Sequence, residues 1–287
     1  MFGELFFASL LPAFLVTVSI YICLNFLSLA DMTCDGSFSL GACAFVTLFG
    51  YNIPEMFSLT IVFILGCAAG LVTSFMINRI KIDGLLAGII SLTALGSINY
   101  LILHSQKAVT FDRSPMLFSS IYYMAIIVAI FLFLIYTVLR SEYGTLLKVY
   151  AIQPKVISSM HLKSENIIYC AIILTNGIIA VAGALFIQTQ SSVTTLIGNG
   201  SLVGGIIALI IGENIIRSKT FLRGIFGCLI GTIIYKAILE LVTHEQALSL
   251  DTELQSLVTA IMIIVLFALK DFRIVTKNMY ARIIKKQ

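Results

Sequence analysis

Charged side chains are scarce in this chain. Asp, Glu, Lys and Arg make up 11% of its 287 residues, apolar residues make up 59%, and the mean hydropathy is +1.05. A soluble domain carries about 25% charged residues, so the composition excludes an ordinary soluble protein. Long apolar segments cross a bilayer as helices, because a helix satisfies its backbone hydrogen bonds within the segment. The sequence therefore predicts an all-α, polytopic membrane protein in contact with membrane lipid.

A large net positive charge and paired cysteines are also missing. The net charge of +4 is small and spread along the chain, which argues against a nucleic-acid partner. The six cysteines form no C-x-x-C pair and fall mainly inside apolar runs, where Cys behaves as a small apolar residue. We therefore expect neither disulfides nor a metal site. The first residues, M-F-G-E-L-F-F, lack the basic start of a cleaved signal peptide, so this segment should be retained as a span.

Catalytic motifs are absent as well. The chain has no G-x-x-x-x-G-K-[ST] phosphate-binding loop, no H-E-x-x-H pair and no pair of carboxylates beside a base in an apolar run. We therefore expect no catalytic residue, no cofactor and no enzyme activity. Glu213 and Lys236 are charges within apolar runs. We interpret Glu213 as lying near a helix end and Lys236 as reaching the interface or pairing with Glu240, so no proton relay is predicted.

Nine apolar segments are candidate membrane spans, since about 20 residues cross the hydrocarbon core. The second and seventh are short, and short spans interrupted by Gly are typical of broken helices in transporters. The candidates are residues 5–29, 36–50, 57–78, 84–103, 117–139, 166–188, 200–216, 221–241 and 254–270.

Four segments are rich in Lys and Arg and should therefore be cytoplasmic. The opposite loops fit, because 189–199 carries no charge and 240–253 carries acidic residues without Lys or Arg. The loop 104–116, with one Lys and one Arg, is an exception. Nine crossings place the N-terminus outside and the C-terminus inside; if 30–50 is re-entrant, eight crossings place both inside, and the charges do not separate these alternatives. The basic segments are 79–81, 140–165, 217–223 and the tail after Leu269.

A short echo relates the two halves of the chain. The sequence D-G-S-F begins the second candidate span, and N-G-S-L begins the seventh. With nine crossings these spans enter from opposite sides, as in an inverted repeat whose broken helices meet near the midplane. We expect Gly36 and Gly200 to hold equivalent backbone positions, with Asp35 and Asn199 capping the helices that begin there. A chance pair of ordinary helix caps is the alternative interpretation.

The cytoplasmic loop 140–165 predicts two short amphipathic pieces, at about 144–152 and 155–162, separated by Pro154. Proline is well tolerated in the first turn of a helix, so the second piece can begin there. This piece should dock against a partner, or alternatively lie on the lipid surface. Its apolar face would consist of Val156, Ile157, Met160 and Leu162.

Five stretches together carry a family resemblance. Three lie between Arg140 and Asn214 and read G-T-L-L-K-V-Y-A-I-Q-P-K, L-T-N-G-I-I-A-V-A-G-A-L-F-I-Q-T-Q and I-G-N-G-S-L-V-G-G-I-I-A-L-I-I-G-E-N. They resemble the permease subunits of bacterial ABC importers of the branched-chain amino acid and ribose class. The stretches D-M-T-C-D-G-S-F-S-L-G-A and K-I-D-G-L-L-A-G-I-I-S-L-T-A-L-G-S-I-N look most like a narrower branch, the tryptophan/tyrosine-type uptake permeases. The resemblance covers most of residues 25–240.

The resemblance implies a set of partners at a bacterial inner (plasma) membrane. Two permease copies would form a homodimer around the pore, two separate P-loop ATPase subunits would hydrolyse ATP beneath it, and an extracytoplasmic binding protein would deliver the solute. Relatives usually carry Gly where this chain has His161, so the sequence departs from the pattern at the end of the loop. The residues that would couple the permease to the ATPase are Tyr150, Pro154, Val156, Ile157, Met160 and His161.

The leading hypothesis is therefore one permease domain covering 1–287, with repeat halves at about 1–139 and 166–270, for amino acids or a related small solute. The alternative is an ion-coupled secondary transporter, against which the cytoplasmic loop and the missing relay carboxylates count. The substrate path should run beside the broken helices and the fourth span, where Gly84, Thr93 and Ser97 also offer small or hydroxylated side chains. Its predicted residues are Asp35, Gly36, Ser37, Gly41, Gly88, Ser91, Asn99, Asn199, Gly200 and Ser201.

Overall fold

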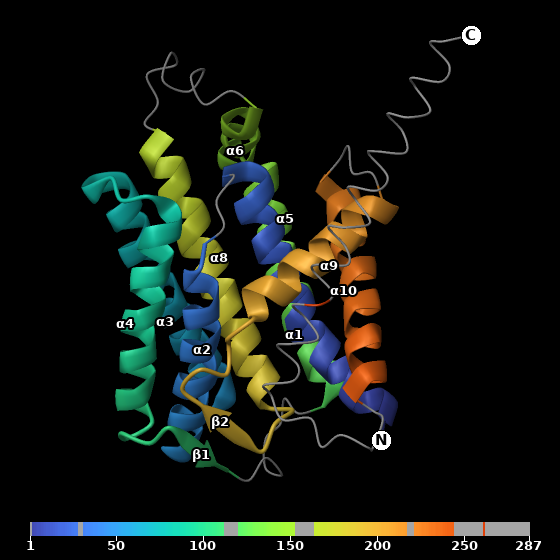
Figure 1. Cartoon of the computed structure of the whole chain (residues 1–287). Coiled ribbons are helices and arrows are strands. Elements are labelled where there is room, and N and C mark those ends of the chain that lie inside the picture. Colours follow the sequence, from blue (N-terminus) through green and yellow to red (C-terminus); the bar gives the residue numbers. More distant parts are fainter. Residues whose placement is uncertain are drawn as a thin grey trace.

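Most of the described chain is helical (Figure 1). The computed structural model describes residues 2–27, 31–111, 120–152, 164–216, 221–243 and 261. The elements are α1 (Phe2–Ile22), the π-helix η1 (Cys23–Leu27), α2 (Thr33–Gly50), α3 (Glu55–Phe75), the π-helix η2 (Met76–Ile80), α4 (Gly84–Ile102), β1 (Ala108–Thr110), α5 (Ile121–Arg140), α6 (Glu142–Ile152), α8 (Ser164–Ile187), β2 (Ser192–Thr194), α9 (Ser201–Ile215) and α10 (Phe221–Thr243).

The predicted spans reappear as helices with bounds shifted by a few residues. Among the described residues, six helices are long and apolar enough to cross a membrane: α1 with η1, α3 with η2, α4, α5, α8 and α10. The short spans become α2, with 18 residues, and α9, with 15. The all-α, polytopic class is therefore confirmed. The ninth candidate, 254–270, lies outside the described residues except for Ile261, so a total of eight or nine crossings stays a prediction.

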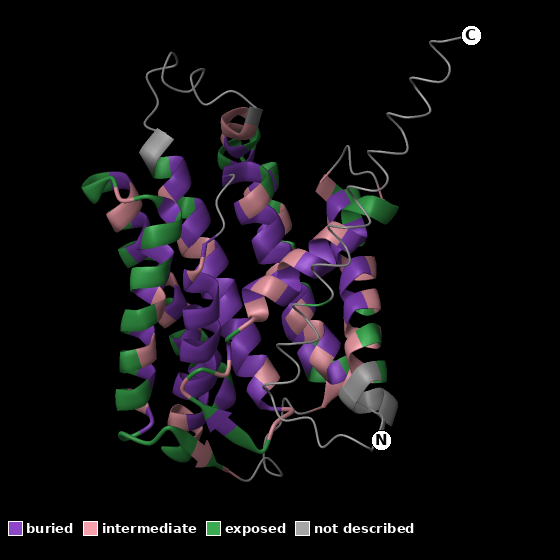
Figure 2. Cartoon of the chain, in the orientation of Figure 1, coloured by how far each residue is buried: buried purple, intermediate pink, exposed green. Residues whose placement is uncertain are grey.

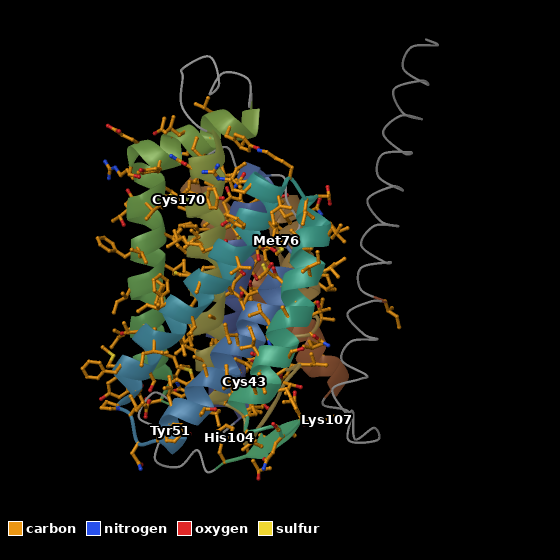
Figure 3. The ribbon with its side chains drawn as sticks, turned by 90° about the vertical axis from the view of Figure 1, so that its left-hand side faces the viewer. Cys43, Tyr51, Met76, His104, Lys107 and Cys170 are labelled. Atoms are coloured by element: carbon orange, nitrogen blue, oxygen red, sulfur yellow. The ribbon has the colours of Figure 1, made fainter. Side chains whose placement is uncertain are left out.

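The two ends of the bundle differ in the charge of their connections. Met76 and Cys170 lie at one end, and Tyr51, His104 and Lys107 lie at the other (Figure 3). The ends of α3, α5 and α9 that lead into basic segments share the first end, whereas α1 begins at the opposite one (Figure 1). This arrangement agrees with cytoplasmic basic segments and with an external start of the chain. Lys107 belongs to the loop 104–116, the exception noted above, and lies at the end opposite the basic segments.

Helix α2 occupies the interior of the bundle, whereas α4 and α5 lie at its surface (Figure 2). Fourteen of the 18 residues of α2 are buried, and only 22% of the apolar window of α5 is buried. The exposed faces of α4 and α5 are rich in Ile, Leu, Phe and Tyr, which suits contact with lipid. Because α2 is surrounded by protein, its small and polar residues need no lipid-compatible face.

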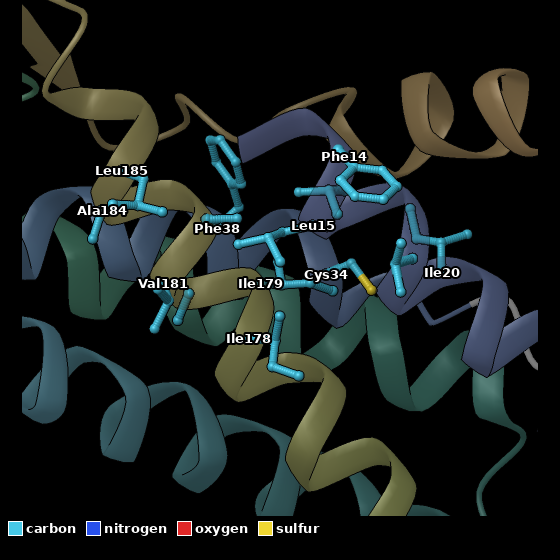
Figure 4. Close-up of a cluster of buried hydrophobic side chains, with 14 of the residues drawn as sticks. Phe14, Leu15, Ile20, Cys34, Phe38, Ile178, Ile179, Val181, Ala184 and Leu185 are labelled. Carbon is cyan, nitrogen blue, oxygen red and sulfur yellow. The ribbon is translucent and has the colours of Figure 1, made fainter. Parts of the chain in front are cut away.

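The core is formed where α1, α2 and α8 pack together (Figure 4). Glycines allow the close approach of α2 and α8: a Cβ on Gly41 would overlap the backbone of Ala180, and a Cβ on Gly183 would overlap the backbone of Phe38. Small residues at helix crossings are the usual means of tight packing within a membrane. This crossing places the first turns of α2 against the polar side chains of α8.

One feature of the fold was not expected from the sequence. Strands β1 and β2 form a two-stranded antiparallel sheet, in which Val109 is paired with Val193. Strands of three residues are too short for a clear alternating pattern, and 189–199 was predicted as a plain loop. The sheet joins the segment after α4 to the segment after α8, and so fixes the chain that leads into α9.

Candidate functional site

Two helices start inside the bundle with their first turns close together. Helix α9 begins beside the middle of α8 and runs toward the α6 end, whereas α2 runs toward the strands (Figure 1). The segment before α9 folds back from β2 through a series of turns, and Gly200 precedes the helix with a φ of 86°, which glycine adopts without strain. Opposite directions agree with the inverted repeat, whose symmetry stays a prediction.

Asp35 lies in the first turn of α2, but its carboxylate binds the start of α9. Oδ2 accepts a hydrogen bond from the backbone N–H of Gly200 at 3.0 Å, and Oδ1 accepts from the N–H of Leu202 at 2.7 Å. The hydroxyl of Ser201 also donates to Oδ1, at 2.8 Å. A buried helix start leaves N–H groups without partners and carries a partial positive charge. The carboxylate of Asp35 satisfies both needs.

Asp31 performs the equivalent task for α2. Its Oδ1 accepts from the backbone N–H of Thr33, and its Oδ2 accepts from Nδ2 of Asn176 on α8, both at 2.9 Å. Asp31 is only 2% exposed. The two carboxylates therefore neutralise two adjacent helix starts, one from within its own segment and one from across the bundle.

These contacts correct the predicted caps. Asp35 was expected to cap α2 and Asn199 to cap α9, and both predictions are wrong, because Asp31 caps α2 and Asp35 caps α9. Gly36 and Gly200 are not equivalent either. Gly36 lies inside α2 and packs on Leu95, whereas Gly200 stands outside α9 in a left-handed conformation.

Hydrogen bonds between side chains tie the start of α2 to three further helices. Ser37 donates to Oδ1 of Asn176 on α8 at 2.7 Å. On the other side, the hydroxyls of Thr33, Thr73 and Ser91 form a chain from α2 through α3 to α4, with distances of 2.9 and 2.7 Å. All five side chains are buried. A polar group in the bundle costs free energy unless it is paired, and these groups pair with one another.

Six of the predicted path residues are therefore packed against other segments of the bundle. Ser37 and Ser91 belong to the buried hydrogen bonds, and Gly88 packs on Met32 and Asp31. Asn99 donates to the backbone oxygen of Thr195 at 3.3 Å. Gly36 and Gly41 are packing positions within α2.

An open groove of about 650 Å³ lies between the outer face of α4 and the turns before α9. The described part of its walls combines apolar side chains with neutral polar ones and contains no charged residue. Asn199 is the member of the predicted path that lines it directly. The lining residues are Leu92, Thr93, Gly96, Ser97, Tyr100, Leu101, Thr195, Leu196 and Asn199.

Asn199 differs from the other polar residues of this groove. The hydroxyls of Thr93 and Ser97 bond to the carbonyl oxygens of Ile90 and Thr93 in their own helix, an arrangement that makes a hydroxyl tolerable at a lipid-facing position. The amide of Asn199 is exposed and makes no side-chain hydrogen bond within the described residues. An unsatisfied amide in hydrocarbon is costly, so this part of the groove requires water, a solute or protein.

Two charged residues lie elsewhere in the bundle: the place of Glu213 near a helix end is confirmed, whereas the reach of Lys236 to the interface or its pairing with Glu240 stays a prediction. Glu213 is exposed near the end of α9, where Nδ2 of Asn25 donates to it at 2.8 Å. The ammonium of Lys236 is half-buried and lies 5.9 Å from the ring centroid of Phe186. Neither charge lines the groove.

The structure describes part of the predicted cytoplasmic loop 140–165. The first amphipathic piece is the helix α6, and Tyr150 is half-buried against the core. The other predicted coupling residues lie outside the described residues: Pro154, Val156, Ile157, Met160 and His161.

Comparison with known proteins decides the family. A family described as the permease component of branched-chain amino acid transport systems matches residues 5–267. The chain belongs to this family. It is a permease component of an ABC-type transport system and a multi-pass protein of the bacterial inner membrane, so the predicted resemblance is confirmed. Such permeases work with ATPase and substrate-binding partners and are not themselves enzymes.

Individual relatives of the permease span nearly its whole length. It is 28% identical over 276 residues to the tyrosine transport system permease protein of Clostridioides difficile, covering 95% of this chain and 92% of the relative. It is 26% identical over 237 residues to the uncharacterized protein RP368 of Rickettsia prowazekii, covering 79% and 84%. PsaBC from Streptococcus pneumoniae, solved in complex with a Fab, shares the fold with a TM-score of 0.57 at 12% identity, covering 92% of this chain and 89% of that one.

Sequence reasoning missed Asp31 and Asn176 as functional parts of this region. Both left a signal: Asp31 stands two residues before Thr33, a spacing typical of side-chain capping, and Asn176 is an amide inside an apolar run, a common form of helix–helix contact in membranes.

Proposed function

We propose that this permease moves its solute along the groove between α4 and the turns before α9. The observation that carries the proposal is the exposed Asn199, two residues before the start of α9, whose amide makes no side-chain hydrogen bond with any residue that the structure describes. Thr93 and Ser97 face the same groove from α4. Behind the wall, Asp35 accepts hydrogen bonds from Gly200 and Ser201 and so stabilises it. The buried residues of the predicted path stabilise the packing of the surrounding helices.

The chemistry of the groove favours a solute without net charge that carries an apolar part. Its described walls offer amide and hydroxyl groups beside Leu92, Leu101 and Leu196, with no Lys, Arg, Asp or Glu. A zwitterionic amino acid with a large side chain fits this mixture. The similarity to a tyrosine transport permease supports an aromatic amino acid, with tyrosine as the first candidate.

The groove is open on one side, and we propose that a second copy of the permease closes it in a homodimer. The exposed apolar face of α4 next to the groove is then shared between lipid and the partner copy. An extracytoplasmic binding protein would deliver the solute to this dimer, and ATPase subunits would dock on Tyr150 and the segment that includes Pro154, Val156, Ile157, Met160 and His161.

Uptake by reconstituted vesicles tests this function. Vesicles that contain the permease together with its ATPase subunits and binding protein should accumulate radiolabelled tyrosine when ATP is supplied on the side of the membrane where the ATPase is bound. A matched preparation with a catalytically inactive ATPase should not. Tyrosine accumulation that is independent of ATP but follows a sodium or proton gradient would contradict the proposal.

Docking can be tested in the same vesicles. Met160→Asp places a carboxylate on the proposed apolar docking face, which is costly in a buried contact, and should abolish uptake while tyrosine still binds to the binding protein. Normal assembly and ATP hydrolysis by this variant would show that docking occurs elsewhere.

A further inference from the structure

We propose that Asp35 is the positioning residue of the permease: it holds the turns that precede α9 on α2, and so sets the shape of the groove between these turns and α4. This inference rests on the proposed function for its transport consequence, whereas its structural part stands independently. Asp35 lies behind the wall and is 7% exposed, so it acts through the turns rather than on the solute.

The turns at 195–200 are held by α2 at consecutive points. Gly198 donates its N–H to Oγ of Ser39 at 2.8 Å, and the same Ser39 hydroxyl donates to the backbone oxygen of Asp35 at 3.0 Å. Two residues later, Gly200 donates its N–H to the Asp35 carboxylate. Asn199, the groove residue, lies between these two anchored glycines. These hydrogen bonds on both sides hold the backbone of Asn199, and with it the direction of its Cα–Cβ bond.

Packing reinforces these hydrogen bonds. A Cβ on Gly198 would overlap the backbone oxygen of Asp35, so the turn lies directly on α2. From the opposite side, Nδ2 of Asn99 on α4 donates to the backbone oxygen of Thr195. The wall of the groove is thus held by hydrogen bonds from both α2 and α4. On the α2 side, the Asp35 carboxylate accepts three of them.

Two consequences follow from the chemistry of a carboxylate at this point. Asn in place of Asp35 retains the size but loses the charge, and it can offer one carbonyl oxygen where the carboxylate offers two. The start of α9 then loses both an acceptor and its charge compensation. The turns should detach from α2 and widen the groove at Asn199.

Cross-linking measures this movement without any transport assay. Ser97→Cys and Asn199→Cys are introduced together, with the native cysteines replaced, and the full-length permease in membranes is treated with bifunctional thiol reagents of increasing length. With Asp35 present, one reagent length should dominate. Asp35→Asn should reduce the yield of that reagent at least severalfold and shift the preference toward longer reagents.

The chain offers a matched control for the positioning role. Ser37 and Ser39 are both buried serines of α2, but Ser37 bonds to α8 whereas Ser39 bonds to the turn. Ser39→Ala should shift the cross-linking preference in the same direction as Asp35→Asn, and Ser37→Ala should leave it unchanged. If Asp35→Asn folds poorly, Ser39→Ala still tests the proposal. An unchanged pattern in both variants overturns it.

Transport kinetics test the consequence for the solute. In vesicles that take up tyrosine, Asp35→Asn should raise KM about tenfold and change kcat less than threefold, because a wider groove weakens binding along the path. Altered cross-linking with unchanged KM would overturn the role of Asp35 in shaping the path. If wild-type vesicles do not transport tyrosine, the proposed substrate fails, and the cross-linking result still decides the positioning role.

Discussion

The start of α2 and the outer face of α4 are both polar regions within a membrane bundle, yet they treat their polar groups in opposite ways. At the start of α2, Asp31, Thr33 and Ser37 are buried and hydrogen-bonded to other segments or helices. On α4, Thr93 and Ser97 are exposed and bond to their own helix. The polar groups of the first region join helices to one another, whereas those of the second are left free to face lipid, a solute or another protein.

The comparison distinguishes polar groups that stabilise the fold from polar groups that are free to contact a solute. Buried groups that satisfy one another contribute to stability and to a unique packing, because removing one partner leaves the other unpaired. Exposed groups at the level of the membrane contribute little to folding but determine what can lie beside them. On this basis we expect substitutions in the α2 region to change stability, and substitutions in the groove to change transport.

The largest effect is expected for Asn176→Leu. The substitution removes the amide that binds both Asp31 and Ser37, and a buried carboxylate then loses a partner. The loss should be about 3 kcal/mol of stability, seen as a large drop in the thermal unfolding temperature of the detergent-purified permease. Thr175→Val is the control, because this neighbour bonds mainly to its own helix backbone. Equal stability of the two variants would contradict a joining role for Asn176.

Asn199→Leu should affect transport more than stability. The amide is exposed in the groove and bonds to no other described side chain, so stability should change by less than about 0.5 kcal/mol. We expect kcat/KM for tyrosine uptake to fall about tenfold, since a polar contact along the path is lost. Normal uptake by a stable variant would remove Asn199 from the path.

Thr33→Val is predicted to have an intermediate effect on stability alone. It breaks the hydroxyl chain that continues through Thr73 to Ser91 but keeps the shape of the side chain. The expected loss is about 1 kcal/mol, with uptake kinetics within twofold of wild type. A change in KM without a change in unfolding temperature would place this chain on the solute path.

The smallest effect should come from Ser97→Ala. Its hydroxyl bonds to the carbonyl oxygen of Thr93 in the same helix at 3.4 Å, so folding should not change measurably. Uptake should fall about two- to threefold if the hydroxyl contacts the solute. Ser91→Ala, on the buried face of α4, is the matched comparison, since it should lower stability and leave uptake unchanged.

Much of the fold followed from the sequence, because apolar length and basic loops are strong signals in a membrane protein. The start of the two short helices near 33 and 201 was visible in the Gly and Ser that follow Asp35 and Asn199. The spacing of Asp31 and Thr33 was a local signal for the cap of α2 that was overlooked. That Asp35 caps α9 was not visible, since this contact joins distant parts of the chain. The β1–β2 sheet and the groove were likewise missed, because each joins segments that are distant in the sequence, as the pairing of Val109 with Val193 shows.

Solute protection of a single cysteine tests the central account most directly. In a cysteine-free permease assembled with its ATPase and binding protein, Asn199→Cys should react with a small hydrophilic thiol reagent, and saturating tyrosine should slow the reaction during turnover. Ser91→Cys, on the buried face of α4, should remain unreactive under both conditions. A residue 199 thiol that stays unreactive, or that reacts at the same rate with and without tyrosine during active uptake, would contradict the assignment of the groove as the solute path.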